Sequence, residues 1–193
     1  MAPLLRPALV LFALFSALTG LVYPLLVTGI AQTVFPYQAH GSLVSRAGQP
    51  VGSELIGQSF AEPGYFWSRP SATTPMQNNG QSSGASNLGP TNPLLEEAVR
   101  GRIEHVREGA PAGQVPVPID LVTASASGLD PDISPAAARY QIERVARTRT
   151  LPAEQLEALI QSQVEEPQWG IFGQPRVNVL RLNLALDALA AKR

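Results

Sequence analysis

The feature that most constrains this chain is an uncharged, apolar stretch close to its N-terminus. No Asp, Glu, Lys or Arg occurs in the 39 residues between Arg6 and Arg46. Within residues 8–35, 20 of the 28 residues are Ala, Val, Ile, Leu, Phe or Tyr. As an α-helix this segment would measure about 42 Å, more than the hydrocarbon core of about 30 Å needs. The sequence therefore predicts one transmembrane helix over about residues 8–34, kinked at Pro24.

A cleaved signal peptide is the alternative explanation of this stretch. Signal peptides have an apolar core of only ~7–15 residues, and small residues of the A-x-A kind follow it. Here the apolar run is longer, and Pro36, Tyr37 and Gln38 stand where a cleavage site would be. We therefore expect a retained anchor. A single span of this kind cannot enclose a pore by itself.

The positive charges beside the span predict its orientation. Arg6 lies directly before the span, whereas Arg46 follows only after an uncharged stretch. The positive-inside rule then favours a cytoplasmic N-terminus. We expect residues 1–35 to form an N-terminal segment that contains the span. Residues 36–193 should form an extramembrane domain outside the cytoplasm.

Short strands and several helices are predicted in the extramembrane part. A hairpin is expected from residues 42–46 and 51–56 around Ala-Gly-Gln-Pro, and further short strands at 65–67, within 116–125 and at the start of 177–191. Asn92-Pro93 and Ser134-Pro135 have the residue types of helix N-caps followed by a first helical Pro. Residues 151–164 and the end of 177–191 have helical spacing of apolar residues. The fold class is α/β, rich in helix, attached to one N-terminal transmembrane helix.

Two of the predicted helices carry distinct faces. In the helix after Asn92, which we expect Gly109 to end, one apolar face consists of Leu95, Val99, Ile103 and Val106. The helix after Ser134 should run through Arg149 with Ala138, Ile142 and Val145 inward. Its exposed basic side would consist of Arg139, Arg144, Arg147 and Arg149. Such a side is usually a solvated surface, although Arg clusters also make contacts with partners.

Residues 70–95 form a second uncharged stretch, which is rich in Pro, Gly, Asn, Ser and Thr. This composition is typical of a loop or linker. Linkers usually carry charge, however, so docking of this stretch against a partner is the alternative.

Several kinds of chemistry are excluded by composition. Lys+Arg number 14 and Asp+Glu 15, so a generally basic nucleic-acid binder is excluded. The chain has no Cys, and Lys192 is its only lysine, so thiolate metal sites, a phosphate-binding G-x-x-x-x-G-K-[ST] loop and a Ser–Lys peptidase are excluded. His40 and His105 are far apart in sequence and predict no metal site. The pair Asp130 and Asp132 lies in a Pro-bounded turn that indicates the start of a helix rather than a catalytic dyad.

Six sequence blocks together resemble one known family, and Gln141, Arg144-Val145-Ala146 and Arg149 continue the pattern between the fourth and the fifth block. In chain order, the blocks are GQ at 57–58, YFWSRPSA at 65–72, SGASNLGPTNP at 83–93, DLVTASASGLD at 120–130, GQPRVNVL at 173–180 and LNLALD at 182–187. In this order, and after a single N-terminal span, they resemble the KdpC family, the C subunit of the bacterial Kdp potassium-transporting P-type ATPase. The resemblance extends over nearly the whole chain.

The resemblance implies a set of partners and a role. The partners would be a KdpA-like potassium-translocating subunit, a KdpB-like ATP-hydrolysing subunit and a small KdpF-like peptide in the bacterial inner membrane. The chain itself would be non-catalytic, stabilise the complex and act as a catalytic chaperone that raises the ATP affinity of the hydrolysing subunit. It would have no cofactor of its own, and ATP would enter only through the complex.

The resemblance also implies an ATP-linked loop, similar to the signature loop of ABC ATPases. Its residues would be Ser83, Gly84, Ser86, Asn87 and Gly89. Ala85 stands where family members commonly have a second Gly, and its methyl group could hinder a close approach to phosphate. A role next to ATP conflicts with the extracytoplasmic domain that the charge pattern predicts. Outside the cytoplasm, the domain would instead cover the potassium entrance of the pump.

Two functions of different classes therefore follow from the sequence. The first is the accessory subunit of a potassium pump. The alternative is a free-standing, membrane-anchored extracytoplasmic enzyme or ligand-binding module.

Overall fold

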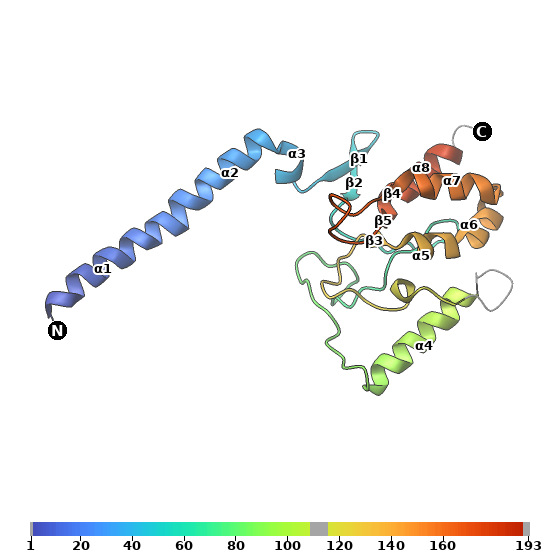
Figure 1. Cartoon of the computed structure of the whole chain (residues 1–193), viewed down its shortest axis with the longest axis horizontal. Coiled ribbons are helices and arrows are strands. Elements are labelled where there is room, and N and C mark those ends of the chain that lie inside the picture. The colour runs from blue at the N-terminus through green and yellow to red at the C-terminus, as the bar shows by residue number, and fades with distance from the viewer. Residues whose placement is uncertain (1, 109–115, 191–193) are drawn as a thin grey trace. The chain divides into compact units, whose positions relative to one another are not determined.

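A computed structural model describes residues 2–108 and 116–190 and divides the chain into two compact units, Met1–Val51 and Gly52–Arg193 (Figure 1). In the first unit, α1 (Ala2–Ala17), a π-helical turn (Leu18–Val22) and α2 (Tyr23–Val34) follow one another. The helix Pro3–Val34 is long and apolar enough to cross a membrane, and its apolar window is not buried within the protein. The predicted N-terminal transmembrane helix is thus confirmed, and it begins earlier than expected.

The π-helical turn lies directly before Pro24. Proline has no backbone N–H and its ring clashes with the carbonyl of residue i−4, here Gly20. In the wider turn the Tyr23 backbone N–H donates to the Leu18 carbonyl oxygen, five residues back. The Thr19 hydroxyl donates to the Phe15 carbonyl oxygen at 2.7 Å, so this polar group also finds a partner inside the helix. The helix therefore accommodates Pro24 through a change of helical pitch.

A short helix, α3 (Pro36–Ala39), and a β-hairpin follow the span. The hairpin consists of β1 (Leu43–Arg46) and β2 (Gln49–Ser53). Its turn is Ala47-Gly48, with φ of 52° and 78°, the positive φ pair of a tight two-residue turn. The predicted hairpin is confirmed, but its turn is shorter than the four residues expected, so the second strand starts and ends earlier.

A small antiparallel sheet organises the second unit. Its strands are β3 (Asp132–Ile133), β4 (Val164–Glu165) and β5 (Arg176–Asn178), in the order β3-β5-β4. Val177 at the centre pairs with Ile133 on one side and Val164 on the other. The alternation of Val177 and Val179 predicts a strand at the start of 177–191, and in the structure the chain changes from strand to helix between these two residues.

Four helices pack around this sheet to form the core (Figure 1). They are α5 (Pro135–Tyr140), α6 (Ile142–Arg149), α7 (Ala153–Gln163) and α8 (Val179–Ala190). The fully buried side chains at their centre are Phe66, Val145, Leu156, Ile160, Val177, Leu182 and Leu186. The helix-rich α/β class is confirmed, as is the helix predicted over 151–164, whose Leu156 and Ile160 are buried.

The helix α4 (Pro93–Arg107) confirms its predicted start. The Asn92 side chain accepts a hydrogen bond from the Leu94 backbone N–H at 2.9 Å, as an N-cap does. Val106 is buried, and Val99 and Ile103 pack against the core. Gly109, which we expected to end this helix, lies outside the described residues.

The predicted strand at 65–67 is wrong. Tyr65 lies in a bend and no strand forms along residues 65–67, which we call the extended segment after the sequence prediction. Side-chain amides take the place of a neighbouring strand. Asn183 Oδ1 accepts from the Phe66 N–H and Asn183 Nδ2 donates to the Phe66 carbonyl oxygen, both at 2.9 Å. Gln141 binds the backbone N–H and carbonyl of Trp67 in the same way, at 2.7 and 3.2 Å. The extended segment is thereby fixed on α8 and at the start of α6.

Two further predictions need correction. Residues 116–125 contain a short 3₁₀ turn, Ile119–Leu121, instead of a strand. The helix predicted through Arg149 is interrupted at Gln141, whose side chain serves the extended segment. Arg144 is buried at 4% exposure and Arg149 is half-buried, so neither belongs to an exposed basic side. Both guanidinium groups bind backbone carbonyls and stack on aromatic rings.

Candidate functional site

The loop for which the sequence predicted an ATP-linked role is anchored at one end. Ser83 Oγ donates to the Ser127 carbonyl oxygen at 3.0 Å, and the Gly84 N–H donates to the same oxygen at 2.9 Å. Ser86, Asn87 and Gly89 are exposed. The structure thus joins the first two residues of the loop to another of the blocks that carry the resemblance, and leaves the others accessible.

The backbone of this loop differs from a phosphate-binding turn at a helix start. Such turns place their N–H groups at the first turn of a helix. Here α4 begins only at Pro93, after its own cap Asn92. Ala85 is half-buried, and Asn87 has a positive φ of 52°, a conformation that Asn tolerates better than most residues.

The stretch before this loop is held on the domain by hydroxyl groups. Ser71 Oγ donates to the Gly128 carbonyl oxygen at 2.7 Å. Thr73 Oγ1 donates to the Met76 carbonyl oxygen at 2.7 Å and accepts from the Asn79 N–H at 3.0 Å. Gly128, with φ of 68°, approaches this segment so closely that a Cβ atom there would lie 2.6 Å from the Gly84 carbonyl oxygen. Side-chain hydrogen bonds therefore order the first part of the uncharged stretch.

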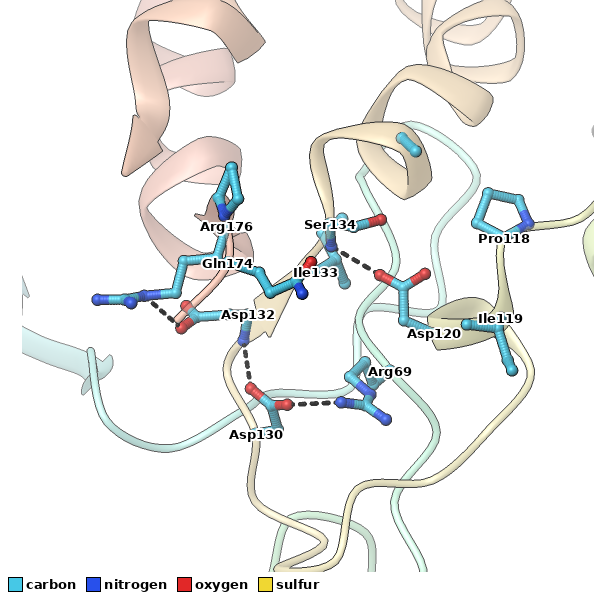
Figure 2. A pocket seen from close by; sticks show the side chains of 12 residues that line it. Arg69, Pro118, Ile119, Asp120, Asp130, Asp132, Ile133, Ser134, Gln174 and Arg176 are labelled. Atoms are coloured by element: carbon cyan, nitrogen blue, oxygen red, sulfur yellow. Dashed lines mark hydrogen bonds and ion pairs between the residues drawn. The ribbon is translucent and has the colours of Figure 1, made fainter. Parts of the chain in front are cut away.

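A pocket of about 550 Å³ lies at the outer edge of β3 (Figure 2). Segments far apart in the chain meet here: Arg69, the 3₁₀ turn with Asp120, the residues around β3, and the start of β5 with Arg176. Apolar side chains, among them Ile119 and Ile133, line the rest of the wall. Three of the blocks that carry the family resemblance thus contribute to one pocket, which the sequence did not predict.

The three carboxylates of this pocket are all paired within it (Figure 2). Asp130 binds Arg69 Nη1 at 2.8 Å and accepts from the Asp132 N–H at 3.0 Å. Asp120 accepts from the Ser134 N–H at 2.6 Å. Asp132 binds Arg176 Nε at 3.1 Å. Two of these carboxylates thus satisfy N–H groups along β3 and its end, which blunts the edge of the sheet against a further strand.

The hydrogen bonds and ion pairs of these three carboxylates join segments of the domain to one another. Among the residues that the structure describes, no group of three His, Cys, Asp or Glu side chains is arranged to hold a metal ion. His40 contacts the Pro36 carbonyl oxygen, and His105 stacks on Trp67 with 4.7 Å between ring centroids. The Asp130 carboxylate accepts from the backbone two residues on, as in a turn. The predicted start of a helix at this pair is wrong, because Asp132 belongs to β3 and the helix begins only after Ser134.

Asp132 gives the pocket a measurable pH response. Burial and the neighbouring Asp130 raise the pKa of the Asp132 carboxyl, although Arg176 opposes them. The folded state therefore holds this proton more tightly than the unfolded state, and the contribution of Asp132 to stability is lost as pH rises through the raised pKa. On acidification from neutral pH, we expect the protein to gain stability relative to its Asp132→Asn variant. Urea unfolding of both in detergent at several pH values measures this difference, and a difference that is constant or of opposite sign contradicts it.

Comparison with known proteins places the chain in a family. The family model described as "KdpC: K+-transporting ATPase, c chain" matches residues 5–188. The chain is 64% identical over 189 residues to the potassium-transporting ATPase KdpC subunit of Variovorax paradoxus, with 98% of each chain covered. It is 60% identical to that of Polaromonas naphthalenivorans, covering 98% of this chain and 96% of the relative. For the protein of Dechloromonas aromatica the identity is 56%, with 98% and 100% covered.

These matches extend across the span and the extramembrane domain alike. The relatives are named as subunits of a complex, which favours the subunit interpretation over a free-standing enzyme or ligand-binding module. The match also covers the anchored loop and the pocket at β3. The chain belongs to the KdpC family, the c chain of potassium-transporting ATPases.

Proposed function

We propose that this chain is the non-catalytic accessory subunit of an ATP-driven potassium uptake pump in the bacterial inner membrane. The observation that carries the proposal is the family match over residues 5–188, which includes all but the first two residues of the helix Pro3–Val34. The proposed partners are a KdpA-like potassium-translocating subunit, a KdpB-like ATP-hydrolysing subunit and a KdpF-like small peptide. The helix would pack among their spans, and the domain would stabilise the assembled pump.

We infer further that the domain lies outside the cytoplasm and acts on ATP affinity indirectly. The charge pattern around the span supports this side. The loop of Ser83, Gly84, Ser86, Asn87 and Gly89 is the proposed contact with the pump, because one end is fixed and the other end is exposed. A contact that favours the ATP-binding conformation of the pump would raise ATP affinity as a chaperone does, without touching the nucleotide.

The orientation predicts a labelling result. A Ser82→Cys variant should react with a membrane-impermeant maleimide in intact spheroplasts, because Ser82 is exposed and the native chain contains no Cys. Pro3→Cys, before the span, should react only after lysis. If the two variants behave the other way round, the domain lies in the cytoplasm and direct contact with ATP becomes the better explanation.

The loop contact predicts an effect on the assembled pump. Asn87→Arg should lower potassium-stimulated ATPase activity and raise the KM for ATP while the complex still assembles. A fixed positive charge close to a potassium path repels cations by roughly 1 kcal/mol at 4 Å in bulk water, and by more where water is scarce. Activity and KM of the purified complex are the measurements.

Two control variants separate charge from other effects. Asn87→Gln imposes similar strain at the positive φ without adding charge. Asn92→Ser retains a side chain that can cap α4, so its effect should be mild. If Asn87→Arg leaves turnover, potassium dependence and the KM for ATP unchanged in an intact complex, the loop is a spacer.

A further inference from the structure

The connection between β4 and β5 presents three large apolar side chains to solvent. Trp169 is 80% exposed, Ile171 76% and Phe172 60%. The rings of Trp169 and Phe172 meet edge to face, with 6.0 Å between centroids. We call residues 167–173 the aromatic hairpin. Exposed apolar groups gathered at one tip indicate a contact with an apolar phase or partner.

The aromatic hairpin is ordered by its own backbone. Gln168 and Phe172 exchange two hydrogen bonds, of 2.8 and 3.0 Å. The Gly170 N–H donates to the Pro167 carbonyl oxygen and the Ile171 N–H to that of Gln168. These N–H groups need no water, which is the condition for placing a loop in the interfacial region of a membrane. Little order would have to be gained on binding.

Charge is confined to the base of the aromatic hairpin. Residues 167–175 contain no Asp, Glu, Lys or Arg. At the base, Glu165 pairs with Arg176 at 2.8 Å and with Arg181 at 3.3 Å. A Trp and a Phe at the tip of an uncharged loop have the composition of the aromatic residues at membrane–water interfaces.

The base of the hairpin is also tied to the segment through which the chain enters the second unit. Arg181, which binds Glu165, binds Glu54 at 2.6 Å. Glu54 follows β2 directly. Only residues 35–53 lie between the end of the helix Pro3–Val34 and Glu54, and they include the helix α3 and the β1–β2 hairpin. This short connection limits how far the segment at Glu54 can lie from the end of the span.

We propose that the aromatic hairpin inserts its tip into the headgroup region of the bilayer, as a second and reversible membrane contact of the domain. The patch is small for a stable interface between proteins, which typically buries about 1,600 Å² in total. A tethered contact needs far less, because the span already holds the local concentration of lipid high. Of the proposed function, this inference requires only that the N-terminal helix spans the membrane. It holds for either orientation of the span, so its failure would leave the proposed function intact.

Photo-crosslinking in the assembled pump tests the proposal directly. Benzoylphenylalanine in place of Phe172 should give adducts of this chain with phospholipid after irradiation in native membranes. The same probe in place of Leu94, which is 61% exposed in the first turn of α4, should give none. Adducts of the Phe172 probe with another protein chain, or with nothing, would overturn the proposal, the first in favour of docking on a partner subunit.

Fluorescence provides a second test without a bulky probe. The chain has two Trp residues, so a Trp67→Phe variant leaves Trp169 as the only one. In nanodiscs of dibrominated phosphatidylcholine, the full chain should show a blue-shifted Trp169 emission. Lipids brominated near the headgroup should quench it more strongly than those brominated deep in the chains. Emission typical of water, without quenching in either lipid, would show that the tip stays outside the membrane.

Discussion

Replacing Arg144 by Met is expected to lower the free energy of unfolding of the extramembrane domain by about 3 kcal/mol. Arg144 lies at 4% exposure and donates to the carbonyl oxygen of Tyr65 at 2.9 Å and to Gln141 Oε1 at 2.6 Å. It donates to the Pro63 carbonyl oxygen as well. Met fills a similar volume but donates nothing, so the Pro63 and Tyr65 carbonyls would lose this donor, and Gln141 Oε1 would keep only the Trp67 N–H.

The guanidinium group also completes an aromatic stack. Its carbon lies 3.6 Å from the centre of the Trp67 ring, and His105 stacks on Trp67 as well. Burial lowers the pKa of Arg144 to about 10, so the group stays charged at neutral pH. Lys carries the same charge but lacks the planar fork that reaches several acceptors at once, so Arg144→Lys should lie between the wild type and Arg144→Met.

Arg147→Met is the matched control, because Arg147 is an exposed arginine on the same helix. This change should alter stability by less than about 0.5 kcal/mol. Urea unfolding of the full chain in detergent, followed by Trp fluorescence, measures all three variants. If Arg144→Met is as stable as Arg147→Met, the hydrogen bonds of Arg144 do not stabilise the fold.

The sequence predicts those elements of the fold that depend on neighbouring residues. The caps Asn92 and Ser134 bind N–H groups two and three residues on, so residue type and spacing suffice to place both helix starts. The transmembrane helix likewise follows from a continuous apolar run. The observed bounds of an element differ from the predicted ones where the local turn differs. At Ala47-Gly48 the turn has two residues instead of four, so β2 starts earlier than predicted.

The sequence did not predict the features that depend on side chains far away along the chain. The extended segment at 65–67 looks like a strand, but its partners are amides 74 and 117 residues away along the chain. Arg144 has the spacing of an exposed helical residue, and only the path of residues 63–65 across α6 buries it. Periodicity reports which face a residue occupies and cannot report what covers that face.

For the candidate site, too, the sequence predicts some features and not others. The family resemblance implied a role for the loop at 83–89, whereas its anchoring by the Ser127 carbonyl became visible only in three dimensions. In the pocket at β3, Asp120 and Asp130 stand at the two ends of one sequence block and meet around Ser134 and Arg69. Nothing in their spacing indicates that both would bind groups along a strand edge.

The amide of Asn183 should prove as important to the fold as Arg144. Asn183 is 2% exposed, and its side chain binds both the N–H and the carbonyl of Phe66, a residue with no exposed surface. Asn183→Leu keeps the size of the side chain and removes the amide acceptor and donor that bind the Phe66 N–H and carbonyl oxygen. Two buried backbone groups would then be unpaired, at a cost of about 1–3 kcal/mol each. We expect the free energy of unfolding to fall by about 3 kcal/mol or more.

A second variant distinguishes hydrogen bonding from packing at this position. Asn183→Asp preserves shape but replaces the donor to the Phe66 carbonyl with an oxygen and buries a carboxylate. It should therefore be strongly destabilised at neutral pH and recover on acidification, because a protonated carboxyl can donate to that carbonyl. Gln155→Leu, an amide-to-leucine change at an exposed position of α7, should have little effect. Urea unfolding at neutral and acidic pH compares the three, and an Asn183→Leu variant as stable as Gln155→Leu would mean that Phe66 packing alone holds the extended segment.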